Sequence, residues 1–88
     1  MLVIVYVPLL ESEYSIFIPV NKKVGTVKNN IIDTISELYD GSLILDRHKL
    51  GLYDSEKTTI YNNDIPVKYS GITNGTKLIL VWRKLYAF

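Results

Sequence analysis

His48 is the single histidine of this 88-residue chain, and it is the side chain that could most readily hold a metal ion. Asp46 and Arg47 precede it, which indicates a charged turn. A metal site would need further ligands, and the chain contains no second histidine and no cysteine. We therefore predict no metal and no other cofactor.

The carboxylates and hydroxyls do not indicate catalysis. The carboxylates fall in expected loops or on the polar face of the expected helix, so no two of them suggest a buried acid–base pair. They are Glu11, Glu13, Asp33, Glu37, Asp40, Asp46, Asp54, Glu56 and Asp64. No serine or threonine has a neighbouring base that would make it a nucleophile. We predict that the chain is not an enzyme.

Phosphate and nucleic-acid motifs are equally weak. Gly71 and Gly75 resemble half of a phosphate-binding loop, but no Lys-Ser or Lys-Thr pair follows, and turn geometry explains both glycines. Lys22, Lys23 and Lys28 form a small basic cluster that we interpret as solvated surface. The formal net charge of +1 at pH 7 predicts no strong attraction to nucleic acid or anionic lipid.

Size and composition indicate one small domain rich in strands. The length allows one domain, and isoleucine, valine, leucine and tyrosine dominate the 48% hydrophobic content. Met1 runs straight into strand-like sequence, so we expect no signal peptide, and no apolar run is long enough to span a bilayer. A cytoplasmic location is expected. We divide the chain into a domain at 1–82 and an apolar C-terminal tail at 83–88.

One helix is predicted from Val27 to Tyr39, with Thr26 as its N-cap and Gly41 just past its end. Its apolar stripe is expected to contain Val27, Ile31, Ile32, Ile35 and Leu38. Its polar face is expected to contain Lys28, Asn29, Asp33, Ser36 and Glu37. Strands are predicted at 1–7, 14–20, 49–53, 58–61 and 76–82. The first and last strands are the most apolar, which favours an α+β fold in which they lie side by side at the centre of a mixed four- to five-stranded sheet packed on the helix.

The predicted sheet is apolar on both faces, although one face should be enough for a sheet covered by a single helix. Alternation directs Val3, Val5, Val7, Ile16, Ile18, Leu78, Leu80 and Trp82 toward the helix. It leaves Leu2, Ile4, Tyr6, Phe17, Tyr53, Ile79 and Val81 on an outer apolar patch. A patch of this size usually marks an interface. We predict a protein interface there, and expect that glutamates at Ile4 and Ile79 would abolish association without unfolding the chain.

Two alternatives to a partner on this patch stay open. The tail residues Leu85, Tyr86 and Phe88, which we include in the predicted interface, could fold over the patch, or the surface could be apolar without a partner. If the patch is an interface, the partner could also be a second copy of the chain, in a homodimer.

Two segments carry a resemblance to a known family: Thr26-Val27-Lys28 at the helix start, and the run from Tyr69 to Leu78. The chain resembles the ubiquitin superfamily over nearly its whole length. Within it, Gly71-Ile72-Thr73-Asn74-Gly75, followed by Lys77 and Leu78, is most similar to the YukD/EsaB-like proteins, which are encoded with type VII (WXG100) secretion systems of Gram-positive bacteria. The apolar tail beyond Val81 departs from that family.

The resemblance implies a ubiquitin-like β-grasp fold and a non-conjugating accessory or regulatory protein that acts through protein–protein contacts. The implied partners are membrane-bound secretion components, which would place the protein peripherally at the inner face of the membrane without inserting it. The alternative is a ubiquitin-like adaptor or scaffold in another bacterial or phage complex. Sulfur carriers share the fold but need a C-terminal Gly-Gly, and this chain ends at Phe88.

Overall fold

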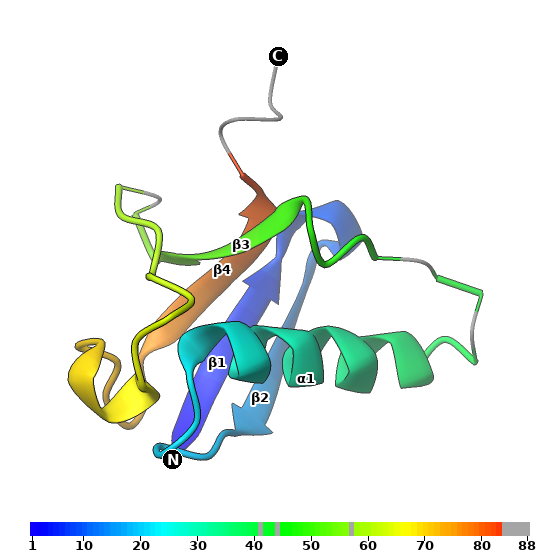
Figure 1. Ribbon diagram of the computed structural model, residues 1–88. Helices are drawn as coiled ribbons and strands as arrows, with labels where there is room; N and C mark the ends of the chain where they lie inside the picture. The colour runs from blue at the N-terminus through cyan, green and yellow to red at the C-terminus, as the bar shows by residue number, and fades with distance from the viewer. Residues whose placement is uncertain (41, 44, 57, 84–88) are drawn as a thin grey trace.

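One helix packs on one face of a mixed four-stranded sheet (Figure 1). The computed structural model describes residues 1–40, 42–43, 45–56 and 58–83, and the statements below concern these residues. The elements are β1 (Leu2–Val7), β2 (Ser12–Phe17), α1 (Val24–Glu37), β3 (Leu50–Asp54) and β4 (Lys77–Trp82), with short 3-10 helices η1 (Pro8–Leu10) and η2 (Val67–Tyr69). The predicted α+β fold is confirmed.

The strand order β2-β1-β4-β3 agrees with a β-grasp topology. β1 pairs antiparallel with β2 and parallel with β4, while β4 pairs antiparallel with β3. The first and last strands therefore lie side by side at the centre, as the sequence predicted, and α1 crosses the face formed by β1 and β2 (Figure 1).

The connection between β1 and β2 is tighter than the sequence suggested, so β2 begins two residues early. Pro8 opens the turn η1, and Glu11 reverses the chain in the left-handed region with a φ of 50°. Val7 then pairs directly with Ser12, and the strand predicted at 14–20 ends at Phe17.

The helix begins at Val24, three residues earlier than predicted, so Thr26 lies in its first turn and is not the N-cap. The backbone amides of Val24 and Gly25 donate to the carbonyl oxygens of Ile65 and Asn63, each at 2.9 Å. These bonds satisfy helix-start donors that a capping side chain would otherwise serve. The approach is close, because a Cβ atom at Gly25 would lie 3.0 Å from Asn63 Cβ.

The core lies between α1 and the inner face of the sheet. Val3, Val5 and Val7 of β1 are buried there, as predicted. The other buried apolar side chains at this interface include Ile18, Val24, Val27, Ile31, Ile32, Ile35, Leu50, Leu52, Leu78 and Leu80. The predicted stripe is therefore correct at four of its members and wrong at Leu38, which is 63% exposed because the helix ends at Glu37 and the chain turns away. Gly41 lies outside the described residues.

The strand predicted at 58–61 is reduced to a single bridge between Tyr53 and Ile60. The carboxylate of Asp54 organises this turn, accepting bonds from the Thr58 hydroxyl at 2.6 Å, the Thr58 amide at 2.8 Å and the Thr59 amide at 3.0 Å. The hydroxyl bond first, and then the Thr59 amide bond, lower the pKa of Asp54 below its usual 3.8. The turn brings Ile60 beside Tyr53 on the outer face of the sheet.

Candidate functional site

Strand pairing places the predicted patch residues of the folded domain on one face, opposite α1. Residues paired across neighbouring strands point to the same side of a sheet. The pairs on the outer face are Leu2 with Phe17, Ile4 with Ser15 and Lys77, Tyr6 with Glu13 and Ile79, Ile79 with Tyr53, and Val81 with Gly51. The three tail residues Leu85, Tyr86 and Phe88 lie outside the described residues.

Members of this outer face differ greatly in exposure. Phe17 is 80% exposed, whereas Tyr53 is buried and Ile79 is only 6% exposed. Leu2, Ile4, Tyr6 and Val81 are half-buried. The surface that a partner could touch therefore consists of Leu2, Ile4, Tyr6, Phe17 and Val81, and we call these residues the outer apolar surface.

Gly51 helps to explain why Tyr53 is covered. A Cβ atom at Gly51 would lie 2.7 Å from Ile60 Cδ1 and 3.2 Å from Tyr53 Cε1, so these two side chains occupy the space that a larger residue would fill. The aliphatic part of Arg83 lies against the same position at 3.2 Å. The sequence pattern contains no sign of this packing, because it depends on the turn that Asp54 holds.

An ion pair crosses the outer face. Lys77 Nζ lies 2.6 Å from Glu13 Oε2, and these residues belong to β4 and β2. Because β1 lies between those strands, the pair passes diagonally over β1 between Ile4 and Tyr6. The outer apolar surface is thus divided, with Leu2 and Phe17 on one side of the pair and Tyr6 on the other.

Trp82 lies on the predicted side of the sheet but is not buried. Its pairing with Leu50 directs it to the inner side, as alternation predicted, but it is 41% exposed because it lies at the end of β4. It lines an apolar hollow of about 280 Å³ together with Val7, Pro8, Leu9, Leu45, Leu50, Leu80 and Val81.

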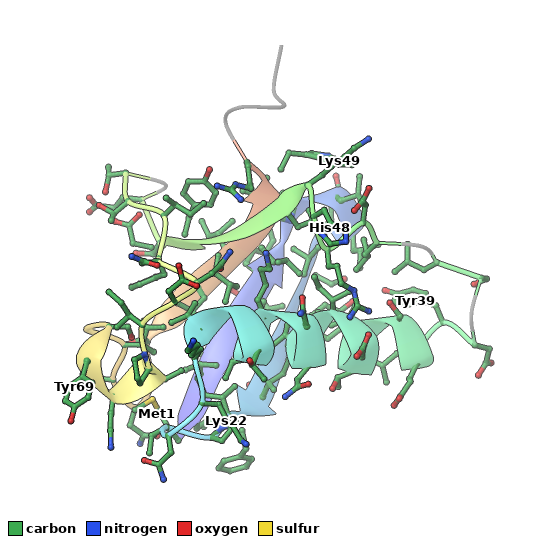
Figure 2. The ribbon with its side chains drawn as sticks, viewed as in Figure 1. Met1, Lys22, Tyr39, His48, Lys49 and Tyr69 are labelled. Atoms are coloured by element: carbon green, nitrogen blue, oxygen red, sulfur yellow. The ribbon has the colours of Figure 1, made fainter. Side chains whose placement is uncertain are left out.

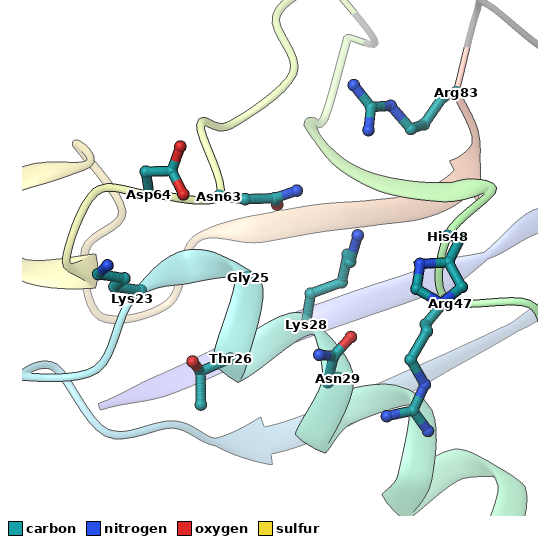
Figure 3. A pocket seen from close by; sticks show the side chains of 10 residues that line it. All are labelled: Lys23, Gly25, Thr26, Lys28, Asn29, Arg47, His48, Asn63, Asp64 and Arg83. Carbon is teal, nitrogen blue, oxygen red and sulfur yellow. The ribbon is translucent and has the colours of Figure 1, made fainter.

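A polar cavity of about 360 Å³ lies between the start of α1 and the edge of the sheet at β3 (Figure 3). Its lining residues are Lys23, Gly25, Thr26, Lys28, Asn29, Arg47, His48, Asn63, Asp64 and Arg83. Sequence analysis missed this cavity because its residues come from four separate segments. The only local signal is the basic pair Lys23 and Lys28, which the sequence pattern indicates to be solvated surface.

Lys28 is buried, which corrects its predicted place on the polar face of the helix. Its side chain is 5% exposed and runs from α1 to the edge of β3, where Nζ donates to the carbonyl oxygen of Leu50 at 3.0 Å. Burial, and secondarily the positive charge of Arg83, lower the pKa of Lys28 below its usual 10.5.

Positive charge predominates around the cavity. Of the lining residues, Lys23, Lys28, Arg47 and Arg83 are cationic, and Asp64 is the one carboxylate among them. Arg47 pairs outside the cavity with Asp33, at 2.6 Å. Within the described residues the remaining ion pair is the one across β1, so Lys23, Lys28 and Arg83 have no carboxylate partner there.

His48 lies at the rim of this cavity, in the charged turn that the sequence predicted. Its backbone amide donates to Asp46 Oδ1 at 2.9 Å. Within the described residues, His, Cys, Asp and Glu side chains form no group of three or more that could hold a metal ion.

We predict that the stability of the wild type rises with pH relative to a Lys28→Met variant. Because the pKa of Lys28 is below 10.5 in the folded chain, the folded state releases this proton at a lower pH than the unfolded chain. The free energy of unfolding of the wild type minus that of the variant should rise as the pH passes the lowered folded-state pKa of Lys28, and should level off above 10.5. Urea titrations at several pH values measure it, and a difference that does not change with pH would contradict the burial of the charge.

No family model matches the chain, and a search of curated proteins finds no match. Among the described residues, no helix is long and apolar enough to cross a membrane.

Proposed function

We propose that this chain is a protein-binding module that docks a partner on its outer apolar surface. The exposure of Phe17 carries the proposal, because a phenylalanine that is 80% exposed on an outer strand adds contact area that the fold itself does not use. Leu2, directly across from it on β1, and the half-buried Ile4 extend this apolar area. Aromatic side chains that become buried on association are typical centres of binding energy.

In its finer form, the proposal is a non-conjugating accessory or regulatory component of a type VII (WXG100) secretion system. The resemblance at Gly71–Gly75 supports it. The same residues also have a structural role: Gly71 and Gly75 adopt positive φ values of 91° and 87°, and Asn74 Oδ1 accepts the amide of Leu2 at 2.8 Å. Turn geometry favours these residue types in any family, so the finer proposal is tested outside the chain itself.

Gene neighbourhood tests the secretion role. Genes for WXG100 proteins and an FtsK-like ATPase beside the gene for this chain would favour the secretion role. Their absence would favour an adaptor or scaffold in another bacterial or phage complex.

A Phe17→Glu variant tests the docking surface. We expect it to weaken partner binding at least about tenfold, because losing a buried aromatic anchor costs about 2 kcal/mol or more. Stability should change by less than about 0.5 kcal/mol, since the side chain is solvent-exposed in the free protein. Light scattering across a range of concentrations measures self-association, and titration with purified WXG100 and FtsK-like secretion proteins measures binding to other chains.

The matched control is Leu38→Glu, which places the same charge at another exposed apolar residue, beyond the end of α1. It should bind like the wild type. Equal loss in both variants would indicate a general charge effect, and normal binding by Phe17→Glu would refute the proposed surface. A wild-type dimer that dissociates on Phe17→Glu substitution would identify the partner as a second copy of the chain.

A further inference from the structure

The polar cavity is unusual because it contains a buried cation, Lys28, that has no carboxylate partner among the described residues. Charged groups that leave water are normally paired, because desolvation of an isolated charge is costly. Lys28 is 5% exposed, and its Nζ has one described acceptor, the neutral carbonyl oxygen of Leu50. Arg83 adds a second positive charge nearby that opposes the charge on Lys28.

We propose that this cavity binds a small soluble molecule that carries a phosphate group. The phosphate would lie at the free edge of β3, where both Lys28 and Arg83 line the cavity, and supply the negative charge that the described part of the cavity lacks at that end. This site differs from the outer apolar surface and does not depend on the function proposed above.

The donors at this end suit phosphate oxygens. An ammonium group has three hydrogens, so Lys28 Nζ keeps two donors after its bond to Leu50. The planar guanidinium of Arg83 can present two parallel N–H groups to one phosphate. Figure 3 shows the Lys28 side chain rising from α1 toward β3, with Arg83 on the far side of that strand and His48 nearby.

The start of α1 contributes a favourable field without direct contacts from its first amides. The amides of Val24 and Gly25 are already bonded to the carbonyl oxygens of Ile65 and Asn63. The partial positive charge of a helix N-terminus still favours an anion near its first turn. The lysine and arginine, and not the helix end, are therefore expected to determine the affinity.

The far end of the cavity indicates what else the ligand carries. Asn63 and Asp64 lie at the end away from Arg83 and His48 (Figure 3). Lys23 lies at that end too (Figure 3), so the charges there are mixed, and the Asp64 carboxylate accepts hydrogen bonds from hydroxyl or amino groups. The cavity, at about 360 Å³, falls in the lower part of the range of small-molecule sites and exceeds the size of one phosphate ion. These features fit a hydroxylated or aminated phosphate monoester.

Titration followed by amide NMR at constant ionic strength tests the proposal, with inorganic phosphate, pyrophosphate and ribose 5-phosphate as probes. We expect saturable shifts at Gly25, Thr26, Asn29 and Asn63, and tighter binding of ribose 5-phosphate than of inorganic phosphate. Lys28→Met and Arg83→Gln should each weaken binding at least about tenfold, because a hydrogen bond to a charged group contributes roughly that much or more.

Lys22→Met is the matched control. It removes the same charge from an exposed side chain that does not line the cavity, on the opposite side of α1 from His48 in the view of Figure 2. Its affinity should equal that of the wild type. The dispersion of each variant's amide spectrum confirms that it is folded, and Arg83→Gln provides a second test if Lys28→Met is not.

Three results would overturn the inference: no saturation with any soluble probe, equal weakening by Lys22→Met, or saturable shifts only when phosphatidic acid vesicles are titrated in place of the soluble probes. Partner binding through Phe17 should be unchanged in Lys28→Met. Failure of the cavity proposal is thereby distinguishable from failure of the docking proposal.

Discussion

Replacing Ile79 with glutamate is expected to lower the free energy of unfolding by about 3–5 kcal/mol, the usual cost of leaving a buried charge without a partner. Ile79 lies on the outer face, yet it is only 6% exposed, between Tyr6 and Tyr53 in neighbouring strands. A domain of this size has a total stability of roughly 4–13 kcal/mol, so the variant should be close to unfolding. Urea denaturation followed by circular dichroism measures the loss.

Ile79→Val is the control for Ile79→Glu. It keeps the site apolar and removes one methylene group, which should cost about 0.5–1.5 kcal/mol. A glutamate variant as stable as the valine variant would show that this position is open to water. The expectation from sequence, that glutamate at Ile79 leaves the fold intact, is revised because the structure covers this residue.

Ile35→Ala is expected to cost about 2–5 kcal/mol, whereas Leu38→Ala should change stability by less than about 0.5 kcal/mol. The sequence placed both residues on one apolar stripe of the helix. The structure buries Ile35 completely against the sheet and leaves Leu38 in solvent, because α1 ends at Glu37. The two substitutions on neighbouring turns therefore distinguish a helix that ends at Glu37 from a longer one.

Thermal and urea unfolding of both variants under the same conditions provide the measurement. Similar losses for Ile35→Ala and Leu38→Ala would support the longer helix predicted from sequence. A small loss at Ile35 would contradict the packing of α1 on the sheet.

The two strands at the centre of the sheet were predictable because their pattern repeats every two residues. Once Val3 is placed inward, alternation directs Val5 inward and Ile4 outward, and the structure agrees. The start of α1 was not predictable in this way. Its first amides bond to the carbonyls of Ile65 and Asn63, which approach only after the later chain has folded back.

The two candidate sites differed in how far sequence could predict them. Local alternation was enough to predict which residues lie on the outer face. The Lys77–Glu13 ion pair across it could not be predicted, because it depends on the register of β4 against β1, which only the folded structure defines. The polar cavity was harder to predict, because it depends on how α1 packs against β3. The sequence pattern places Lys28 on the polar face of the helix, but in the structure its side chain extends to the edge of β3 and donates to the carbonyl oxygen of Leu50.

The parallel pairing of β1 with β4 has a consequence for the protein during its synthesis. β1 is made first and β4 is the last of the described strands, yet they are neighbours at the centre of the sheet. While the ribosome is still adding the intervening chain, β1 can pair with β2 but keeps its other edge unpaired. An unpaired, apolar edge invites pairing with other chains. The nascent protein is therefore most vulnerable to aggregation until residues 77–82 emerge and pair with the free edge of β1.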